Sequence, residues 1–213
     1  MGCDSSTDVG EDYEFPQHSV FLSPFAVQRT TVPKSEWRKF IQDTGYSWGF
    51  WNEISQRSPT DEHPIVFVSW KDTFEFCRWK SSQLGKVVRL PTEAEWEFVC
   101  RCVSDVSQKQ WSFEDWCLAM GDTNPSVLFS RGPSVKSVSG IWEGVSEWCF
   151  DSFHEDAYQK LPKINPVCLA ESNFKVWRGG CPLSEGYPRC SYRGFDKPDA
   201  RTYGLGFRVV ISE

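Results

Sequence analysis

The amino-acid sequence predicts an α+β fold, in which two or three helices accompany a mostly antiparallel sheet and much irregular loop. Three observations predict this class. Helical periodicity with capping residues is confined to the first half of the chain, strand-forming segments dominate the last third, and long stretches between them show neither pattern. With 213 residues, of which 39% are hydrophobic and 15% aromatic, the chain is long enough for one large domain with its own core.

Three helices are predicted from the residues at their ends. The first covers residues 33 to 45, and the second follows Ser69 as N-cap and ends at Gly85. The third begins where Thr92 and Glu95 have the spacing of a capping box. The side chains expected to face the core from the first two helices are Trp37, Phe40, Ile41, Trp70, Phe74 and Cys77.

An early strand is expected over residues 18 to 29, interrupted at Pro24, with Val20, Leu22 and Ala26 on its inward face. Three further segments are rich in strand formers, and they lie near residues 141–153, 174–180 and 205–211. The segments predicted as loops are 46–63, which is anchored by aromatic side chains, and 103–139.

The charge balance argues against nucleic acid as a partner. The chain has 23 Lys and Arg against 29 Asp and Glu, for a net charge of −6, and its basic residues are not clustered on one stretch. No run of 18 apolar residues is present, so no membrane-spanning helix is expected.

Residues 1–14 are expected to be a flexible N-terminal spacer, and residues 15–213 a single domain. The first six residues, MGCDSS, allow three interpretations. Gly2 and Ser6 fit a myristoylation pattern, Cys3 could be the lipid-bearing residue of a bacterial lipoprotein, and the segment could be an unmodified tail.

Four segments resemble the formylglycine-generating-enzyme-like (sulfatase-modifying factor) family. They occur in this order across roughly residues 18 to 213: HPIVFVSWKDTFEFCRW, RLPTEAEWEF, GVSEWCFD and the terminal series RGG, YRGF and LGFRVV. The resemblance implies the C-type-lectin-like fold of that family. It does not by itself imply an activity, because one fold supports many functions.

The resemblance also implies where catalysis would lie. Formylglycine generators use two cysteines five residues apart, the first of them four residues beyond the paired glycines. This chain has Ser184 and Arg189 at those positions, whereas Cys181 and Cys190 are nine residues apart. We therefore expect no catalytic residues and no enzyme of this kind. For Cys181 and Cys190, buried structural thiols, a mutual disulfide, and a redox or metal function all stay open.

No cofactor and no metal site is expected. The three histidines, His18, His63 and His154, are too far apart in sequence to suggest two imidazoles on one ion. Carboxylates recur every four residues in one segment, and family members hold calcium in this part of the fold. These carboxylates are Glu143, Glu147 and Asp151. They are either solvated or salt-bridged, or, as the alternative, they bind calcium.

The last 36 residues resemble, more particularly, the variable proteins that retroelements diversify, those of Treponema among them. The resemblance implies a variable region over about residues 177–213. Its fixed scaffold would comprise Arg178, Gly179, Gly180, Cys190, Tyr192, Arg193, Pro198, Arg201 and the terminal LGFRVV. The positions expected to vary and to bind ligand are Leu183, Ser184, Tyr187, Pro188, Gly194, Phe195, Asp196, Ala200, Thr202, Tyr203 and Gly204.

The residue types at these positions suit recognition. Tyr187, Phe195 and Tyr203 would supply large rigid contacts, while small residues adapt, as in antibody paratopes. The alternative is burial, in which Phe195 or Tyr203 packs under a loop.

From this resemblance we expect a non-enzymatic ligand-binding protein, a receptor or adhesin whose C-terminal face is diversified by retroelement mutagenesis. The expected partner is a protein or another surface ligand, and membrane contact would come only through a lipid anchor at Cys3. The expected form is a monomer on the bacterial cell surface, anchored to the outer membrane. The alternatives are a formylglycine-generating or related oxidase, and an accessory module of the same fold.

Overall fold

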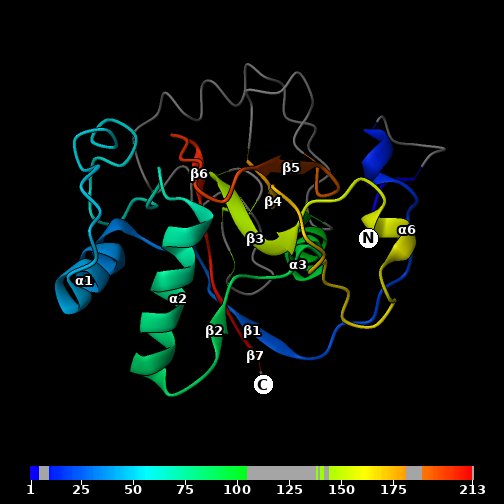
Figure 1. Cartoon of the computed structure of the whole chain (residues 1–213), viewed down its shortest axis with the longest axis horizontal. Helices are drawn as coiled ribbons and strands as arrows, with labels where there is room; N and C mark the ends of the chain where they lie inside the picture. Colours follow the sequence, from blue (N-terminus) through cyan, green and yellow to red (C-terminus); the bar gives the residue numbers. More distant parts are fainter. Residues whose placement is uncertain (5–9, 105–137, 139, 142–143, 181–188, 213) are drawn as a thin grey trace.

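The structure is a computed structural model that describes residues 1–4, 10–104, 138, 140–141, 144–180 and 189–212 (Figure 1). Two sheets form its centre, with α1 and α2 on one side and α6 on the other (Figure 1). One sheet has the strand order β1-β7-β2 and the other has the order β5-β4-β3-β6. The elements are η1 (Asp12–Glu14), β1 (Phe25–Val27), α1 (Lys34–Thr44), α2 (Trp70–Leu84), β2 (Val88–Arg89), α3 (Glu93–Ser104), β3 (Ser146–Ser152), α6 (Ala157–Lys160), β4 (Lys175–Arg178), β5 (Arg193–Asp196), β6 (Leu205–Gly206) and β7 (Val210–Ser212).

The three predicted helices are confirmed, together with the ends of the first two and the start of the third. Gly45 and Gly85 end α1 and α2 in the left-handed conformation, with φ of 68° and 61°, which glycine adopts without steric cost. The Ser69 hydroxyl accepts from the backbone N–H of Asp72 at the start of α2. Thr92 and Glu95 form the predicted capping box before α3.

The inward face of α2 differs from the prediction at Phe74. Phe74 is 42% exposed, whereas Phe76 and Trp79 are buried in the core together with the predicted Cys77. Trp70 lies in the first turn of α2 and is only half-buried. The row of side chains that faces the core therefore does not run through Trp70. Phe74 instead stacks on the outer side of Trp70, with ring centroids 5.6 Å apart.

The early strand is shorter than predicted and faces the other way. Within β1, Phe25 and Val27 pack against the core while Ala26 is exposed. The strand begins only after Pro24, and its pairing with β7 places Ala26 opposite Ile211. Because side chains alternate along a strand, this register fixes Ala26 on the outer face.

The predicted terminal strand is divided between the two sheets. β6 pairs with β3 in parallel, and β7 pairs with β1 and β2 in antiparallel fashion. Between them, the carbonyl groups of Phe207 and Val209 accept from the backbone N–H groups of Val32 and Gln28, each at 2.9 Å. These bonds fix the segment that passes from one sheet to the other. All other strand pairs are antiparallel, as predicted.

Aromatic side chains dominate the main core, which lies between α1, α2 and the sheets. Trp37 stacks on Phe76 at 5.7 Å, and Trp48 of the predicted aromatic loop packs edge-on against Trp37 at 5.7 Å. A second, smaller cluster surrounds Trp96 and Cys100 of α3. Over the described ranges, no helix has the length and apolar character needed to cross a membrane.

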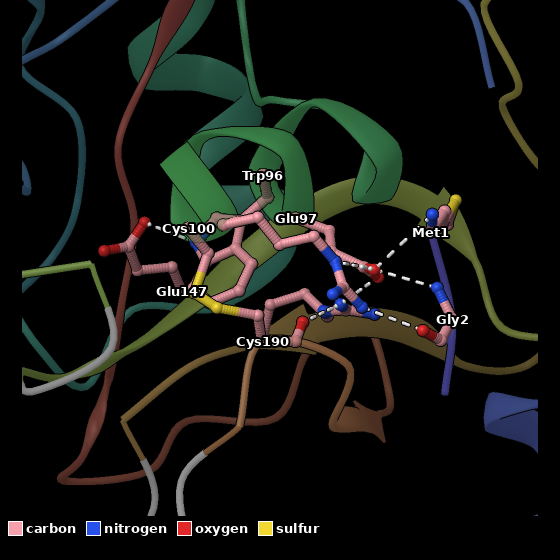
Figure 2. The surroundings of a disulfide bond; sticks show 9 residues. Met1, Gly2, Trp96, Glu97, Cys100, Glu147 and Cys190 are labelled. Atoms are coloured by element: carbon pink, nitrogen blue, oxygen red, sulfur yellow. Dashed lines mark hydrogen bonds and ion pairs between the residues drawn. A yellow bond between two sulfur atoms is a disulfide. The ribbon is translucent and has the colours of Figure 1, made fainter. Parts of the chain in front are cut away.

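A disulfide joins Cys100 of α3 to Cys190, which precedes β5 (Figure 2). This pairing corrects the expectation for Cys190, because its partner is Cys100 and not Cys181. Cys181 lies outside the described residues. The bond connects positions 90 residues apart, with Cα atoms 5.7 Å apart, and so ties the C-terminal segment to the second core cluster.

We predict that removing this disulfide lowers stability substantially. Closure of a loop of this length reduces the entropy of the unfolded chain, which corresponds to about 4 kcal/mol. Cys190→Ala should therefore lose up to that amount in free energy of unfolding, measured by denaturant titration under oxidising conditions. The wild-type chain in reductant is the matched comparison, and equal midpoints with and without reductant would contradict the prediction.

Candidate functional site

A buried ion cluster ties the C-terminal strands to α3. Arg193 of β5 contacts Glu93 with both ends of its guanidinium, at 2.6 and 3.1 Å. Arg178, at the end of β4, donates to Glu93 at 2.7 Å, to Glu97 at 2.6 Å and to the Tyr158 hydroxyl at 2.9 Å. Arg178 and Arg193 are both fully buried. The cluster therefore fixes two of the predicted scaffold residues in place.

The opposite charges of this cluster stabilise one another in their ionised forms. Burial disfavours the ionised form of Glu93, but Arg193 and Arg178 hold the pKa of that carboxyl below its usual range. Burial opposes the charged form of Glu97 as well, and Arg178 and Arg101 again keep the pKa of Glu97 low. The cluster is therefore ionised, and loss of one partner would leave a buried charge unpaired.

Glu147 and Arg208 form a second buried pair. Arg208 contacts both carboxylate oxygens of Glu147, at 2.6 and 2.7 Å. The Trp96 indole donates to the same carboxylate at 3.0 Å (Figure 2). Burial raises the pKa of Glu147 against the opposing attraction of Arg208. The pair joins β3 to the segment between β6 and β7.

Asp72 of α2 anchors the segment before β6. Arg201 contacts both oxygens of Asp72, at 2.9 and 3.0 Å, and the Tyr46 hydroxyl donates to Asp72 at 2.8 Å. Asp72 also accepts from the backbone N–H of Ser69, so the carboxylate that caps the helix also holds Arg201. Arg201, expected to belong to the fixed scaffold, is thus held by a buried carboxylate.

The backbone of residues 197–204, here called the display segment, is bound along its length. Its carbonyl groups accept from the backbone N–H groups of Lys71, Phe67 and Ser146, which belong to other parts of the chain, and from Ala200 within the segment. These bonds measure 2.8 to 3.2 Å. The accepting carbonyl groups are those of Lys197, Pro198, Thr202 and Gly204.

The side chains of the display segment are largely directed to solvent. Thr202 and Gly204 are exposed, Tyr203 is 49% exposed and Ala200 is half-buried. Tyr203 stacks on Phe67 with ring centroids 4.8 Å apart, and it does not enter the core. A fixed backbone and outward side chains are therefore combined in one segment.

Two glycines predicted to vary differ sharply in the space around them. A Cβ atom at Gly204 would meet nothing within 4 Å. A Cβ atom at Gly194 would lie 2.2 Å from the indole ring of Trp177, which covers Gly194 from the neighbouring strand. Gly194 is thus wrong as a freely variable position, because only glycine leaves room for the Trp177 ring.

Phe195 and Asp196, on the edge strand β5, are intermediate cases. Phe195 is 39% exposed, but its ring stacks on the buried Phe153 at 3.9 Å, so part of it contributes to the core. Asp196 is half-buried and accepts from the backbone N–H of Lys197 at 2.7 Å. Asp196 also lies opposite Lys175 in the sheet register.

Four of the predicted ligand-binding positions, Leu183, Ser184, Tyr187 and Pro188, lie outside the described residues. Arg189, which stands at the second catalytic position of the implied cysteine pair, is described. Its guanidinium forms an ion pair with the buried Glu14, and its Nε donates to Glu14 at 3.1 Å. An arginine in a structural ion pair cannot supply a thiolate.

Residues assigned to the spacer take part in this region. Cys3 is buried, with its Sγ atom 3.2 Å from a Glu14 oxygen and 2.9 Å from the Ser191 hydroxyl, and burial raises the pKa of the thiol. A lipid chain on this sulfur would require residues 1–4 to leave their observed position. Residues 5–9 are not among those described.

Within the described ranges, no three His, Cys, Asp or Glu side chains gather as a metal site would require. The three histidines contact separate parts of the chain, since His18 packs edge-on against Tyr158, His63 contacts Thr60 and His154 contacts the Glu171 carbonyl. Glu143 lies outside the described residues. The other two carboxylates considered for calcium are engaged by the chain itself, Glu147 by Arg208 and Asp151 by backbone N–H groups.

Sequence reasoning missed three residues that shape this region: Glu14, Asp72 and Phe67. Asp72 had a local signal, because Ser69 and Asp72 have capping-box spacing. Glu14 and Phe67 had none, since their partners Arg189 and Thr202 lie 175 and 135 positions further along the chain.

We predict that the same substitution has unequal effects on stability at the two glycines. Gly194→Ala should lower the free energy of unfolding by roughly 1–3 kcal/mol through overlap with Trp177. Gly204→Ala should change it by less than about 0.5 kcal/mol. Denaturant titration of both variants checks this, and equal losses would show that the space around the two glycines does not control their tolerance.

We also predict that Asp151 makes stability depend on pH. Burial and the charge of Glu93 raise the pKa of Asp151 to about 7, although backbone N–H groups of Cys168 and Glu93 oppose the shift. Because the folded pKa exceeds the unfolded value, the folded chain keeps a proton that the unfolded chain releases. The contribution of Asp151 to stability should therefore fall as pH rises from about 4 to about 7.

Comparison with Asp151→Asn isolates this effect, because the other groups titrate in both chains. The variant should show a smaller loss of unfolding free energy between pH 4 and 7. Any constant offset reflects the changed hydrogen bonds, so only the slope is tested. Parallel pH profiles would refute the assignment.

Comparison with known proteins bears on the family. A family model described as the sulfatase-modifying factor enzyme 1-like domain matches residues 1–213. The formylglycine-generating enzyme of Streptomyces coelicolor is 26% identical over 264 aligned residues, which cover 93% of this chain and 82% of that protein.

Two solved structures share the fold. PvdO from Pseudomonas aeruginosa has a TM-score of 0.76 at 22% identity, covering 100% of this chain and 90% of that one. Treponema denticola variable protein 1 has a TM-score of 0.64 at 18% identity, covering 100% of this chain and 91% of that one. The predicted α+β, C-type-lectin-like fold is thereby confirmed, and a variable protein shares it. With its whole length matched by the family model, the chain belongs to the sulfatase-modifying factor enzyme 1-like family.

Proposed function

We propose that this domain is a non-enzymatic binding protein whose display segment, with neighbouring variable positions, recognises a protein or other surface ligand. The observation that carries the proposal is the combination found in residues 197–204. Hydrogen bonds and the Asp72–Arg201 pair hold the backbone, while the side chains of Thr202 and Tyr203 are exposed. Such an arrangement lets side chains change at little cost in stability.

Two further observations support the proposal. Arg189 is ion-paired with Glu14 at a position where formylglycine generators would need a cysteine. The fold is also similar to that of Treponema denticola variable protein 1. Diversification by a retroelement, display on a bacterial surface through a lipid anchor, and a monomeric state belong to the same proposal.

The alternative is an oxidase, which the relatives named formylglycine-generating enzymes favour. The two functions make different demands. An oxidase must convert the cysteine of a sulfatase-motif peptide to formylglycine, whereas a binding protein tolerates changes in its display segment.

Two matched libraries test the proposed function. The first randomises the display positions Ala200, Thr202, Tyr203 and Gly204, and the second randomises the inward positions Gly194, Arg201, Leu205 and Phe207. Most members of the first library should fold, with melting temperatures within about 8 °C of the parent. Most members of the second should not fold, because they lose buried packing or the Asp72 partner.

Binding is then selected from the first library against a folded test protein such as lysozyme. Micromolar or tighter binders are expected, and the parent chain should leave a sulfatase-motif peptide unconverted by mass spectrometry, with or without copper. Equal folding losses in both libraries, or formylglycine formation, would overturn the proposal.

A further inference from the structure

We propose that the binding surface continues from the display segment onto two aromatic side chains outside the variable region, Phe50 and Phe67. Together with Tyr203 these side chains form what we call the aromatic platform. The platform would receive an apolar side chain of a protein partner. This inference rests on the proposed function and names a constant part of the same surface.

The three rings of the platform are in direct contact. Tyr203 stacks on Phe67 at 4.8 Å with an interplanar angle of 25°, and Phe50 meets Phe67 edge-on at 5.3 Å. The buried Trp48 supports Phe50 from below, with centroids 5.6 Å apart. Phe50 and Phe67 are half-buried and Tyr203 is 49% exposed, so the platform is both supported and accessible.

Phe67 adopts a backbone conformation that its side chain disfavours. Its φ is 61°, in the left-handed region where a bulky residue is an outlier. The buried neighbours Val66 and Val68 and the hydrogen bond from Phe67 N–H to the Thr202 carbonyl, at 3.1 Å, hold it there. Asparagine or glycine would satisfy this backbone better, so phenylalanine stands here at a conformational cost that its contact with the main core must offset. Strained residues of this kind gather at functional sites.

The position of Phe67 couples it to the variable residue above it. The Thr202 carbonyl fixes the backbone of Phe67, and the ring of residue 203 covers part of the Phe67 ring. A smaller residue at position 203 would expose more of the Phe67 ring and would leave Phe67 in the surface. Phe67 would therefore reach the partner whichever side chain stands at position 203.

The geometry favours a protein as the partner. Small-molecule sites enclose most of their ligand in a concave pocket, whereas the platform ends in the exposed residues Thr202, Tyr203 and Gly204. Arg201, 28% exposed, lies over the Phe50 ring at 5.1 Å, and Asp72 neutralises its charge. An apolar centre bordered by a partnered arginine, continuous with the proposed interface, resembles the hot spots of protein interfaces.

The test uses binders selected from the display library against lysozyme. Phe67→Asn removes the ring while keeping a residue that tolerates positive φ, so relief of the backbone should offset part of the packing lost from the core, and the variant should stay folded. In most binders this change should weaken lysozyme binding at least tenfold, measured by surface plasmon resonance. Phe50→Ser provides a second variant with the same expectation and no change in the strained position.

Phe98→Ser is the matched control, because Phe98 is 52% exposed on α3 and contacts Phe25 instead of the platform. It should change affinity less than twofold. Binders that lose nothing with Phe67→Asn and Phe50→Ser would overturn the platform while leaving the proposed function intact. A library that gives no binder of any kind would overturn both, whereas binders of oligosaccharides but of no protein would overturn the platform and leave the proposed function intact.

Discussion

The structure depends on the buried ion pairs around Glu93. One carboxylate at the start of α3 is contacted by Arg178 and Arg193, which belong to neighbouring strands of the C-terminal region. Buried charges are tolerated only when they are paired, so neither strand can shift without exposing or isolating one of them. The Cys100–Cys190 bond fixes the same two regions covalently. The last quarter of the chain is therefore held by side chains that point inward, independently of those that point outward.

The division between inward and outward side chains explains why residues close in sequence differ so much in burial and in the space available for substitution. Arg201 is bound to Asp72, while Thr202 and Tyr203 next to it are exposed. Gly194 is covered by Trp177, whereas a Cβ atom at Gly204 would meet open space. Family membership alone does not give this pattern, because relatives of one fold share the frame and differ in what they present. The residues that are free to change can be recognised only from the space around each of them.

Local signals in the sequence were sufficient for the helices and for the fold class. Ser69, Gly85 and the Thr92–Glu95 capping box each act within a few residues, and the structure confirms them. The errors arose where distant segments meet. The register with β7 set the outward face of Ala26, Cys190 paired with a residue 90 positions away, and Trp177 excluded any side chain at Gly194. The exposure of Thr202, Tyr203 and Gly204 agrees with their expected role, although exposure alone does not test it.

The order of strands in the smaller sheet has a further consequence for how the cell makes this protein. β7 lies between β1 and β2, so its central strand follows the display segment in synthesis. A nascent chain must wait for that strand before the sheet can close, and a message interrupted within the display segment yields a product whose β1 and β2 have no common neighbour. Such a product would expose unpaired strand edges, so the smaller sheet can close only after the whole display segment has been synthesised.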